Sequence, residues 1–248
     1  MLMTKNRTLA TVIRILQQIK HDHRTIALIV VVPTFLMGLL SWILSSKPDA
    51  FNQWGGPLLG IFPLIVMFLI TSVATLRERT SGTLERLMTT PIKKTEFIFA
   101  YALAFCILGT IQAVVAGLTS IYIFGLETGG NTVAVICIAI LDSMLGTALG
   151  LLASSVARTE FQAVQFMPVV LIPQFLLGGF IVPRDSLPSF LNFLSDLMPL
   201  SYSVDALSQV FREETKLNSG FVGNVLVVLL ISLIALAIGG LTLRRSSK

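Results

Sequence analysis

The chain contains several nearly uninterrupted apolar runs of about twenty residues, which is the helix length that spans the ~30 Å hydrocarbon core of a bilayer. A soluble domain breaks its apolar runs more often, because a buried face needs a polar face opposite it. Window hydropathy predicts six spans, at about residues 25–46, 57–76, 96–124, 132–157, 162–182 and 221–243. The sequence therefore predicts an all-α integral membrane protein, in which residues 25–248 form a six-helix transmembrane domain.

Composition supports a membrane protein and excludes several other classes. Hydrophobic side chains make up 54% of the residues and charged ones only 12%, against about 25% charged in an average soluble domain. The net charge of +5 comes from basic residues at the ends of apolar runs, so we expect the lipid bilayer as a partner and not nucleic acid. Cys106 and Cys137 both lie within apolar runs, which predicts neither a disulfide framework nor a metal site.

The distribution of basic residues predicts the orientation in the membrane. If the N-terminus is cytoplasmic, fourteen of the eighteen Lys and Arg residues fall on cytoplasmic segments, and the external segments carry seven acidic residues. Cytoplasmic loops of membrane proteins are enriched in Lys and Arg. We therefore predict that the N- and C-termini are both cytoplasmic.

The first 24 residues predict an amphipathic helix that precedes the first span. Basic residues lie between apolar residues that recur at helical spacing. The apolar residues are Leu9, Val12, Ile13, Leu16 and Ile19. This pattern is typical of a helix that lies on a membrane surface, here on the cytoplasmic side.

The predicted cytoplasmic connection between the second and third spans contains a short helix of its own. Gly82 allows the chain to turn after the second span. Leu84, Leu87 and Met88 then recur at i, i+3 and i+4, and Pro91 disfavours helix at the preceding residue. The result is a helix with one apolar face outside the predicted spans.

Two interpretations of this short helix remain open. It is either a basic surface helix that rests on lipid, or a docking helix that fits a groove on a soluble partner. In the second case Glu85 and Arg86 would make polar contacts at the rim of the groove.

Two motifs resemble the type 2 ATP-binding-cassette (ABC-2) export permeases, in particular the daunorubicin and multidrug-resistance permeases. The run Glu-Arg-Thr-Ser-Gly-Thr-Leu-Glu-Arg-Leu at residues 78–87, closed by Thr90 and Pro91, is similar to the signature loop of that family. The run Pro-Leu-Ser-Tyr-Ser-Val-Asp-Ala at residues 199–206 is similar to a segment before its last span. With the six spans, the resemblance covers essentially the whole chain.

The resemblance implies that the loop contains a coupling helix, which inserts into an ATPase subunit and transmits its motion to the spans. The residues assigned to this coupling are Gly82, Thr83, Leu84, Glu85, Arg86, Leu87, Met88, Thr90 and Pro91. The chain has no G-x-x-x-x-G-K-[ST] phosphate loop, so we expect that it is not itself an enzyme and binds no cofactor. ATP and Mg would bind to two copies of a separate ABC ATPase subunit.

The family also implies the rest of the assembly and its location. A second copy of this permease, or a related one, would complete the path across a bacterial or archaeal cell membrane. Amphipathic drug-like or lipid-like cargo suits a largely apolar interior, and a glycan is an alternative. An ion-coupled secondary transporter or channel is the main competing interpretation. An intramembrane enzyme is disfavoured, because His21 and His23 lie at the cytoplasmic edge of the first span.

The fourth predicted span carries an acidic residue near the bilayer centre, where an ionised carboxylate is costly. Asp142 should therefore face protein or water, and Gln112, at a similar predicted depth, could form a hydrogen bond with it. Asp142, Gly146, Gly150 and Ser154 share one stripe of the helix. Small residues in such a stripe allow close helix approach, and we favour packing within the chain over a seam between two copies.

The fifth span and the segment after it predict the family's extracellular gate. Pro168, Pro173, Gly178, Gly179 and Pro183 should break a continuous helix repeatedly. A proline-interrupted apolar segment at about 186–211 should be re-entrant and not spanning. The candidate residues of a substrate path or gate are Gln112, Asp142, Gln165, Gln174, Phe175, Phe180, Pro199 and Tyr202.

Overall fold

Every regular element is helical in the residues that the computed structural model describes, which are 2–81, 94–129, 131–211 and 219–242. In chain order the elements are α1 (Leu2–His21), α2 (His23–Ile43), α3 (Pro48–Thr80), α5 (Lys94–Tyr122), α6 (Thr132–Val156), α7 (Glu160–Leu177), the 3₁₀ helix η1 (Arg184–Ser186), α8 (Ser189–Asp196), α9 (Pro199–Phe211) and α10 (Ser219–Thr242). The predicted all-α class is confirmed.

Within these residues, six helices are long and apolar enough to cross a membrane: α2, α3, α5, α6, α7 and α10. The six predicted spans are thus confirmed, and most of their bounds differ by only a few residues. The exception is α3, which begins at Pro48 and continues to Thr80 as one 33-residue helix. The prediction started this span at 57, because the polar first turns of α3 lower its hydropathy.

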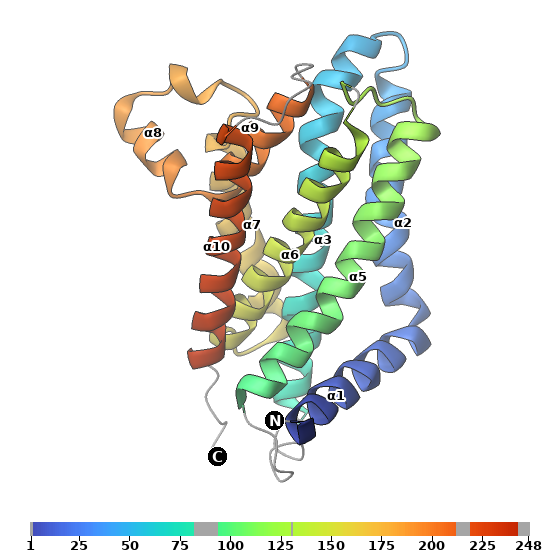
Figure 1. The fold of residues 1–248 in the computed structure, drawn as a ribbon, viewed down its shortest axis with the longest axis vertical. Helices are drawn as coiled ribbons and strands as arrows, with labels where there is room; N and C mark the ends of the chain where they lie inside the picture. Colours follow the sequence, from blue (N-terminus) through green and yellow to red (C-terminus); the bar gives the residue numbers. More distant parts are fainter. Residues whose placement is uncertain (1, 82–93, 130, 212–218, 243–248) are drawn as a thin grey trace.

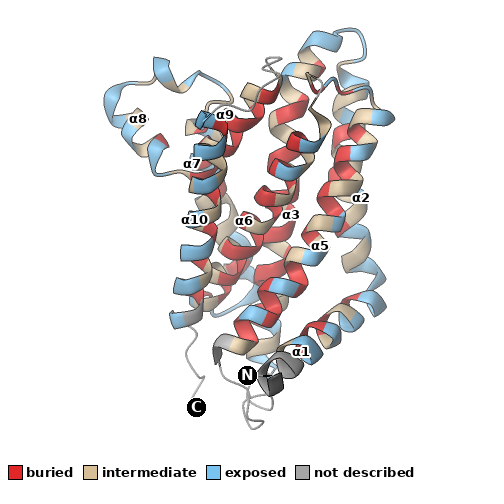
Figure 2. Ribbon diagram, in the orientation of Figure 1, coloured by how far each residue is buried: buried red, intermediate tan, exposed pale blue. Residues whose placement is uncertain are grey.

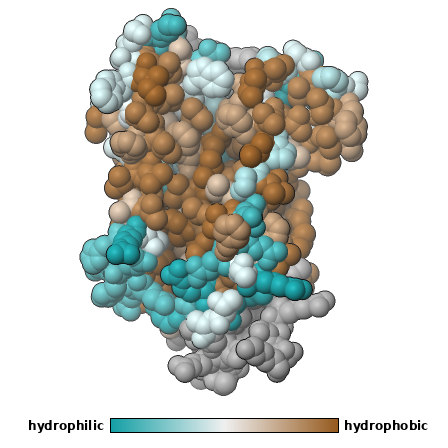
Figure 3. Space-filling view, turned by 180° about the vertical axis from the view of Figure 1, so that it is seen from behind, coloured by the Kyte–Doolittle hydropathy of each residue, from teal (hydrophilic) through white to brown (hydrophobic). Residues whose placement is uncertain are grey.

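The long helices lie side by side, with a short helical segment at each end of the bundle (Figure 1). Helix α1 crosses one end, which we call the α1 end, and helices α8 and α9 lie at the opposite end, which we call the α9 end. Helices α3 and α10 both finish at the α1 end. A broad apolar band covers the surface between the two ends, and hydrophilic side chains gather toward the α1 end (Figure 3). This distribution is the one expected of a membrane protein.

Helices α3 and α6 form the centre of the bundle (Figure 2). Two-thirds (67%) of the most apolar window of each is buried, against 17% for α2 and α7. A Cβ added to Gly146 would lie 2.3 Å from the carbonyl oxygen of Leu64, and one added to Gly150 would lie 2.6 Å from that of Phe68. Glycine is therefore needed where α6 meets the backbone of α3. The predicted small-residue stripe packs within the chain.

Helix α1 is amphipathic as predicted, and three of the five predicted apolar residues, Val12, Leu16 and Ile19, pack against the bundle; that α1 lies on a membrane surface stays a prediction. Val12, Ile15 and Ile19 are buried in a cluster with residues of α5, whereas Leu9 and Ile13 are exposed. The predicted face included Leu9 and Ile13 and omitted Ile15. The correction arises because α1 packs on another helix, which selects the stripe that faces α5.

Helix α7 is not broken at its prolines, contrary to the prediction. It continues through Pro168 and Pro173 to Leu177. The chain turns only at Gly178 and Gly179, where Gly179 has φ of 87°, a conformation that favours glycine. Within the last turn before this bend, the Gln174 side chain donates to the carbonyl of Val170 at 3.0 Å. Pro168 and Pro173 have no backbone N–H for the carbonyls four residues earlier, those of Val164 and Val169, so α7 continues despite two missing helical hydrogen bonds.

The segment at 186–211 consists of two short helices, α8 and α9, which follow η1 at the α9 end (Figure 1). Helix α9 packs on α3, α6 and α10 with Leu200, Val204 and Leu207 buried. That the segment re-enters a membrane stays a prediction.

Candidate functional site

The predicted coupling residues lie outside the described residues, which stop at Ser81 and resume at Lys94. These residues are Gly82, Thr83, Leu84, Glu85, Arg86, Leu87, Met88, Thr90 and Pro91. The structure does describe the end of α3, which leads into this segment. The side chains that hold this end of α3 form the described part of the candidate coupling site.

Two arginines connect the end of α3 to α6 and α7. Arg77 forms a bidentate ion pair with Glu160 at the start of α7, with its Nε and Nη2 atoms each 3.0 Å from a carboxylate oxygen. Arg79 donates to the backbone carbonyl of Ser154 near the end of α6. Bidentate pairing fixes the relative direction of two side chains as well as their distance. The last turns of α3 are thus joined to two other spans.

A second group of polar side chains joins the end of α3 to α1 and α5. Glu78 accepts a hydrogen bond from Nε2 of Gln18 at 3.1 Å, and Nη1 of Arg14 lies 3.7 Å from Oε1 of Glu78. Arg14 also donates to the hydroxyl of Tyr101 at 3.1 Å. Sequence reasoning assigned no role to these residues. Arg14 and Gln18, which lie one turn apart on α1, were the available signal.

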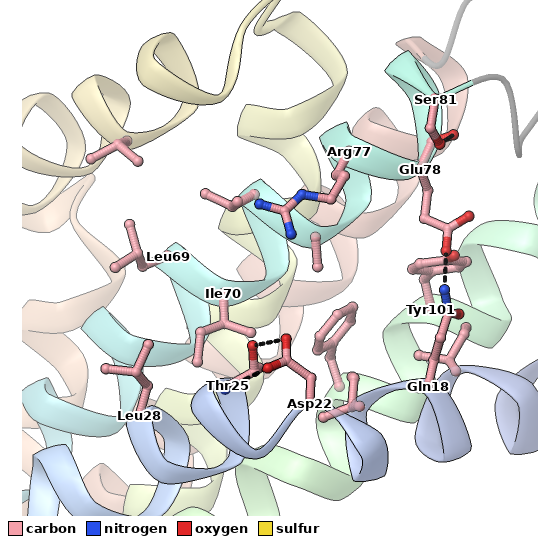
Figure 4. A pocket seen from close by; sticks show the side chains of 16 residues that line it. Gln18, Asp22, Thr25, Leu28, Leu69, Ile70, Arg77, Glu78, Ser81 and Tyr101 are labelled. Carbon is pink, nitrogen blue, oxygen red and sulfur yellow. Dashed lines mark hydrogen bonds between the residues drawn. The ribbon is translucent and has the colours of Figure 1, made fainter.

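A cavity of about 540 Å³ lies at the α1 end, where α1, α2, α3, α5 and α7 meet, and Gln18, Glu78 and Tyr101 line part of it. In Figure 4, Glu78, Tyr101 and Gln18 gather on one side of the cavity, Leu28, Leu69 and Ile70 lie on the other, and the guanidinium of Arg77 lies between them. The cavity was not predicted, because it depends on how α1 crosses the bundle.

Asp142 is completely buried in the centre of the bundle, as expected of a carboxylate within a span. Its partner is Ser203 of α9, whose hydroxyl donates to Oδ1. The predicted hydrogen bond with Gln112 is wrong, and within the described residues neither amide atom of Gln112 has a hydrogen-bond partner. Oδ2 of Asp142 faces Gly60 of α3, where an added Cβ would lie 2.4 Å from it. The carboxylate therefore joins α6 to α9 across α3.

Several candidate gate residues meet where α7 bends toward α9. Gln174 is buried, and its Oε1 atom accepts from the backbone nitrogen of Leu200 at 3.3 Å. The rings of Phe175 and Phe180 stack across the bend with centroids 5.1 Å apart. Pro199 is buried in the first turn of α9. Gln165 does not join this group, because its side chain is exposed on α7.

An arginine that the sequence did not single out holds the segment beyond α7. Arg184 of η1 pairs with Asp196 of α8 and with Asp205 of α9. Its guanidinium carbon lies 5.2 Å from the ring centroid of Tyr202, and the Tyr202 hydroxyl donates to the carbonyl of Asp196 at 2.8 Å. The position of Asp205 within the motif at residues 199–206 was the available signal for this cluster.

Comparisons with known proteins match most of this architecture. The model of the ABC-2 type transporter family matches residues 6–211. The chain is 28% identical over 177 residues to the probable multidrug ABC transporter permease YbhS of Escherichia coli. This match covers 71% of this chain and 45% of the relative. It is also 26% identical over 161 residues to the linearmycin resistance permease protein LnrN of Bacillus subtilis. That match covers 64% of this chain and 42% of the relative.

A eukaryotic relative is the ABC transporter G family member 20 of Dictyostelium discoideum, which is 28% identical over 149 residues, 60% of this chain and 20% of the relative. The matched part is therefore less than half of each of these relatives. The family model, in contrast, spans the first five candidate spans, the bend after α7 and the whole of α9. The chain is thus a membrane protein that belongs to the ABC-2 type transporter family.

Proposed function

We propose that this chain is the permease subunit of an ATP-driven exporter, and that residues 82–91 form the coupling helix that contacts a separate ATPase subunit. The observation that carries the proposal is the family match over residues 6–211, which includes this segment. The bacterial relatives described above are permeases by name. The 248 residues contain no phosphate-loop motif, so ATP and Mg would be bound by the ATPase, which we propose is present in two copies.

The length of α3 supports this placement of the coupling segment. A helix of 33 residues is about 50 Å long, whereas the hydrocarbon core is ~30 Å thick. At least one end of α3 therefore extends beyond the hydrocarbon, and the charged side chains of Arg77, Glu78 and Arg79 near its last turn favour the end that precedes the coupling segment. An apolar face on residues 82–91 then has a purpose if it packs on another protein.

The contacts at the end of α3 provide a route from the coupling segment to the rest of the chain. A push on this segment would act on α3 directly. It would reach α7 through the Arg77–Glu160 pair and α1 through Glu78 and Gln18. Closure of two ATPase subunits could thereby rearrange several helices at once, as alternating access requires.

The remaining parts of the proposal follow the family and the charge distribution. The α1 end would be cytoplasmic, with both termini on that side, and a second copy or a related permease would complete the path. The cargo would be amphipathic and drug-like or lipid-like, or a glycan. The bend between α7 and α9, with Gln174, Phe175 and Phe180, would act as the outer gate, and Asp142 would hold α9 to α6 beside it.

Charge reversal in the coupling segment tests the proposal. The permease would be co-expressed with a candidate ABC ATPase subunit, as wild type and as the variants Glu85→Lys and Arg86→Glu. We expect recovery of the ATPase with the permease to fall about tenfold, which corresponds to ~1.4 kcal/mol of binding free energy. Vanadate-sensitive transport in inverted vesicles should fall with it.

The matched control is Lys47→Glu, an exposed charge reversal before α3 at the opposite end. It should leave ATPase recovery unchanged. Unchanged recovery and transport in both coupling variants would contradict the assignment of residues 82–91. Transport that proceeds without the ATPase and responds to an ion gradient would instead support an ion-coupled transporter.

A further inference from the structure

The cavity at the α1 end has the size of a small-molecule site. Its volume of about 540 Å³ falls within the ~300–1,000 Å³ typical of ligand pockets. Residues of this chain alone line it, from α1, α2, α3, α5 and α7 (Figure 4). The cavity therefore does not need a second copy of the permease to form.

The lining of the cavity changes from apolar to charged along α3. Leu69, Ile70 and Val73 line its deeper part, and Arg77 and Glu78 line the part nearest the end of the helix. At a rise of 1.5 Å per residue, Leu69 and Glu78 lie about 14 Å apart along the helix axis. A ligand that follows α3 would thus meet apolar side chains at one end and charged ones at the other.

The residues of α2 that line the cavity also change from polar to apolar, here from the start of the helix onward, because α2 runs antiparallel to α3 (Figure 1). Asp22 and Thr25 line the cavity at the start of the helix, and Leu28 follows one turn later. In Figure 4, Leu28 lies on the same side of the cavity as Leu69 and Ile70. Two helices from different parts of the sequence therefore provide matched apolar and polar zones, as an amphipathic ligand requires.

The polar zone carries an excess of negative charge in the described residues. Among the residues that line the cavity, Asp22 and Glu78 are acidic and Arg77 is basic, so their formal charges sum to −1. Arg77 is occupied by its bidentate pair with Glu160, and Arg14 lies beside Glu78. Asp22 forms no ion pair within the described residues, and the positive charge of Arg77 acts on it at longer range.

Asp22 is exposed and able to accept a further partner. Its two carboxylate oxygens accept from the backbone nitrogen and the hydroxyl of Thr25, at 3.2 and 2.7 Å. These hydrogen bonds lower the pKa of Asp22, so the side chain is ionised at neutral pH. A carboxylate offers about four lone-pair sites, which leaves acceptor positions for a ligand cation.

We propose that this cavity binds an amphipathic amine, with its protonated nitrogen beside Asp22 and its apolar body between Leu28, Leu69 and Ile70. The amine is either a soluble amphipath or the headgroup of an ethanolamine lipid from the adjacent leaflet. The inference deepens the proposed function by naming the chemistry of a ligand. It rests on that function only in placing the ligand next to Ser81, where the coupling segment begins.

A photo-crosslinking experiment tests the proposal on the full chain in phosphatidylcholine nanodiscs, without any ATPase. The probe is a diazirine-bearing dodecylamine, and the diazirine-bearing dodecanol and dodecanoic acid of the same length are the comparisons. Mass spectrometry of the digested protein maps the labelled residues. We expect the amine to label residues 69–78 and 22–28, and the alcohol and acid to label them about threefold to fivefold less, as the loss of one ion pair implies.

Two kinds of variant separate charge from shape. Asp22→Asn removes the charge and keeps a residue that caps helices well, and it should lower amine labelling by the same factor while leaving alcohol labelling unchanged. Val73→Trp fills the apolar zone and should lower labelling by both probes. Asp49→Asn, an exposed acidic residue at the α9 end, is the matched control and should change neither.

The outcomes distinguish a lipid amine from a soluble one. They also separate a failure of the ligand proposal from a failure of the coupling proposal. Loss of amine labelling when the nanodiscs contain phosphatidylethanolamine indicates a lipid ligand, and persistence of labelling indicates a soluble one. Equal labelling by the three probes, or equal amine labelling in Asp22→Asn and wild type, would overturn the proposal. The test involves no ATPase, so its result is independent of whether residues 82–91 bind one.

Discussion

The centre of the bundle and its α1 end hold the same helix, α3, in different ways. In the centre, the backbone of α3 contacts Gly146 and Gly150 of α6 directly, and the neighbouring carboxylate of Asp142 is completely buried. At the α1 end, α3 is held by side chains such as Arg77 and Glu160, which are 64% and 47% exposed. Backbone contact permits few alternatives, whereas exposed ion pairs exchange partners at little cost. Contact with α6 thus constrains the centre of α3 closely, whereas the exposed Arg77–Glu160 pair permits movement between α3 and α7 at the α1 end.

The largest expected effect comes from a side chain added to the centre. Gly146→Ala would place a Cβ 2.3 Å from the carbonyl oxygen of Leu64, so α3 and α6 would have to separate. We expect a loss of about 3 kcal/mol in the free energy of unfolding, measured by thermal unfolding of the purified protein in detergent. Gly223→Ala in α10 is the matched control, since nothing lies within 4 Å of its added Cβ. An equal loss of unfolding free energy in both variants would show that the close contact between α3 and α6 is not what stabilises the centre.

A smaller effect is expected when a buried hydrogen bond is removed. Ser203→Ala deletes the donor to Asp142 and leaves Oδ1 buried without it. An unsatisfied buried acceptor costs about 1–3 kcal/mol, which the same unfolding measurement would detect. Ser232→Ala is the control, because that buried hydroxyl bonds only to Val228 of its own helix. If Ser203→Ala left the free energy of unfolding unchanged, the contacts in the centre would be no more important for stability than those at the α1 end.

The exposed pair at the α1 end should contribute less. Arg77→Glu breaks the ion pair with Glu160 and places two like charges together, yet we expect a loss of less than about 1 kcal/mol in stability. Vanadate-sensitive transport should fall much more than stability, because the connection between α3 and α7 is lost. The swapped double variant Arg77→Glu with Glu160→Arg should restore transport. If transport stays at the wild-type level in the single variant, this pair transmits no motion.

The smallest expected effect concerns pH at the start of α2. The pKa of Asp22 is lowered from its ordinary value of 3.8 by hydrogen bonds from Thr25. A lowered pKa in the folded state stabilises the protein above the ordinary value, and this contribution is lost as the pH falls through the lowered pKa. The melting temperature of Thr25→Val should therefore lie slightly below that of wild type, by a constant amount from pH 7 to 5. The gap should narrow below about pH 4, and a gap that widens there would contradict this assignment.

Much of the fold could be predicted from local sequence. The six spans follow from apolar runs, because the bilayer sets the length of a crossing helix. The stripe at Gly146 and Gly150 was visible as a repeat of four residues, and the structure confirms that it packs within the chain. The interruption after α7 was predicted too, but it occurs only at Gly178 and Gly179 and not at the prolines.

The partners of the polar side chains could not be predicted in this way. Asp142 was paired with Gln112 because the two lie at similar depths in adjacent spans, yet its partner Ser203 lies 61 residues further along the chain. Depth in the membrane gives only the position along the helix axis. A hydrogen bond also requires that both helices be rotated so that the two side chains face each other. The same reason explains why Arg184, Arg14 and Tyr101 were not singled out.

The sequence by itself determined that this chain spans a membrane, where most of its six spans begin and end to within a few residues, and to which family it is similar. Each of these depends on properties that accumulate along a continuous segment: hydropathy, periodicity and short motifs. Only the tertiary structure decided which face of α1 is buried, that α9 provides the donor to Asp142, and that five helices line a cavity at the α1 end. These features depend on how distant helices are rotated against one another, and close contact between their side chains fixes that rotation.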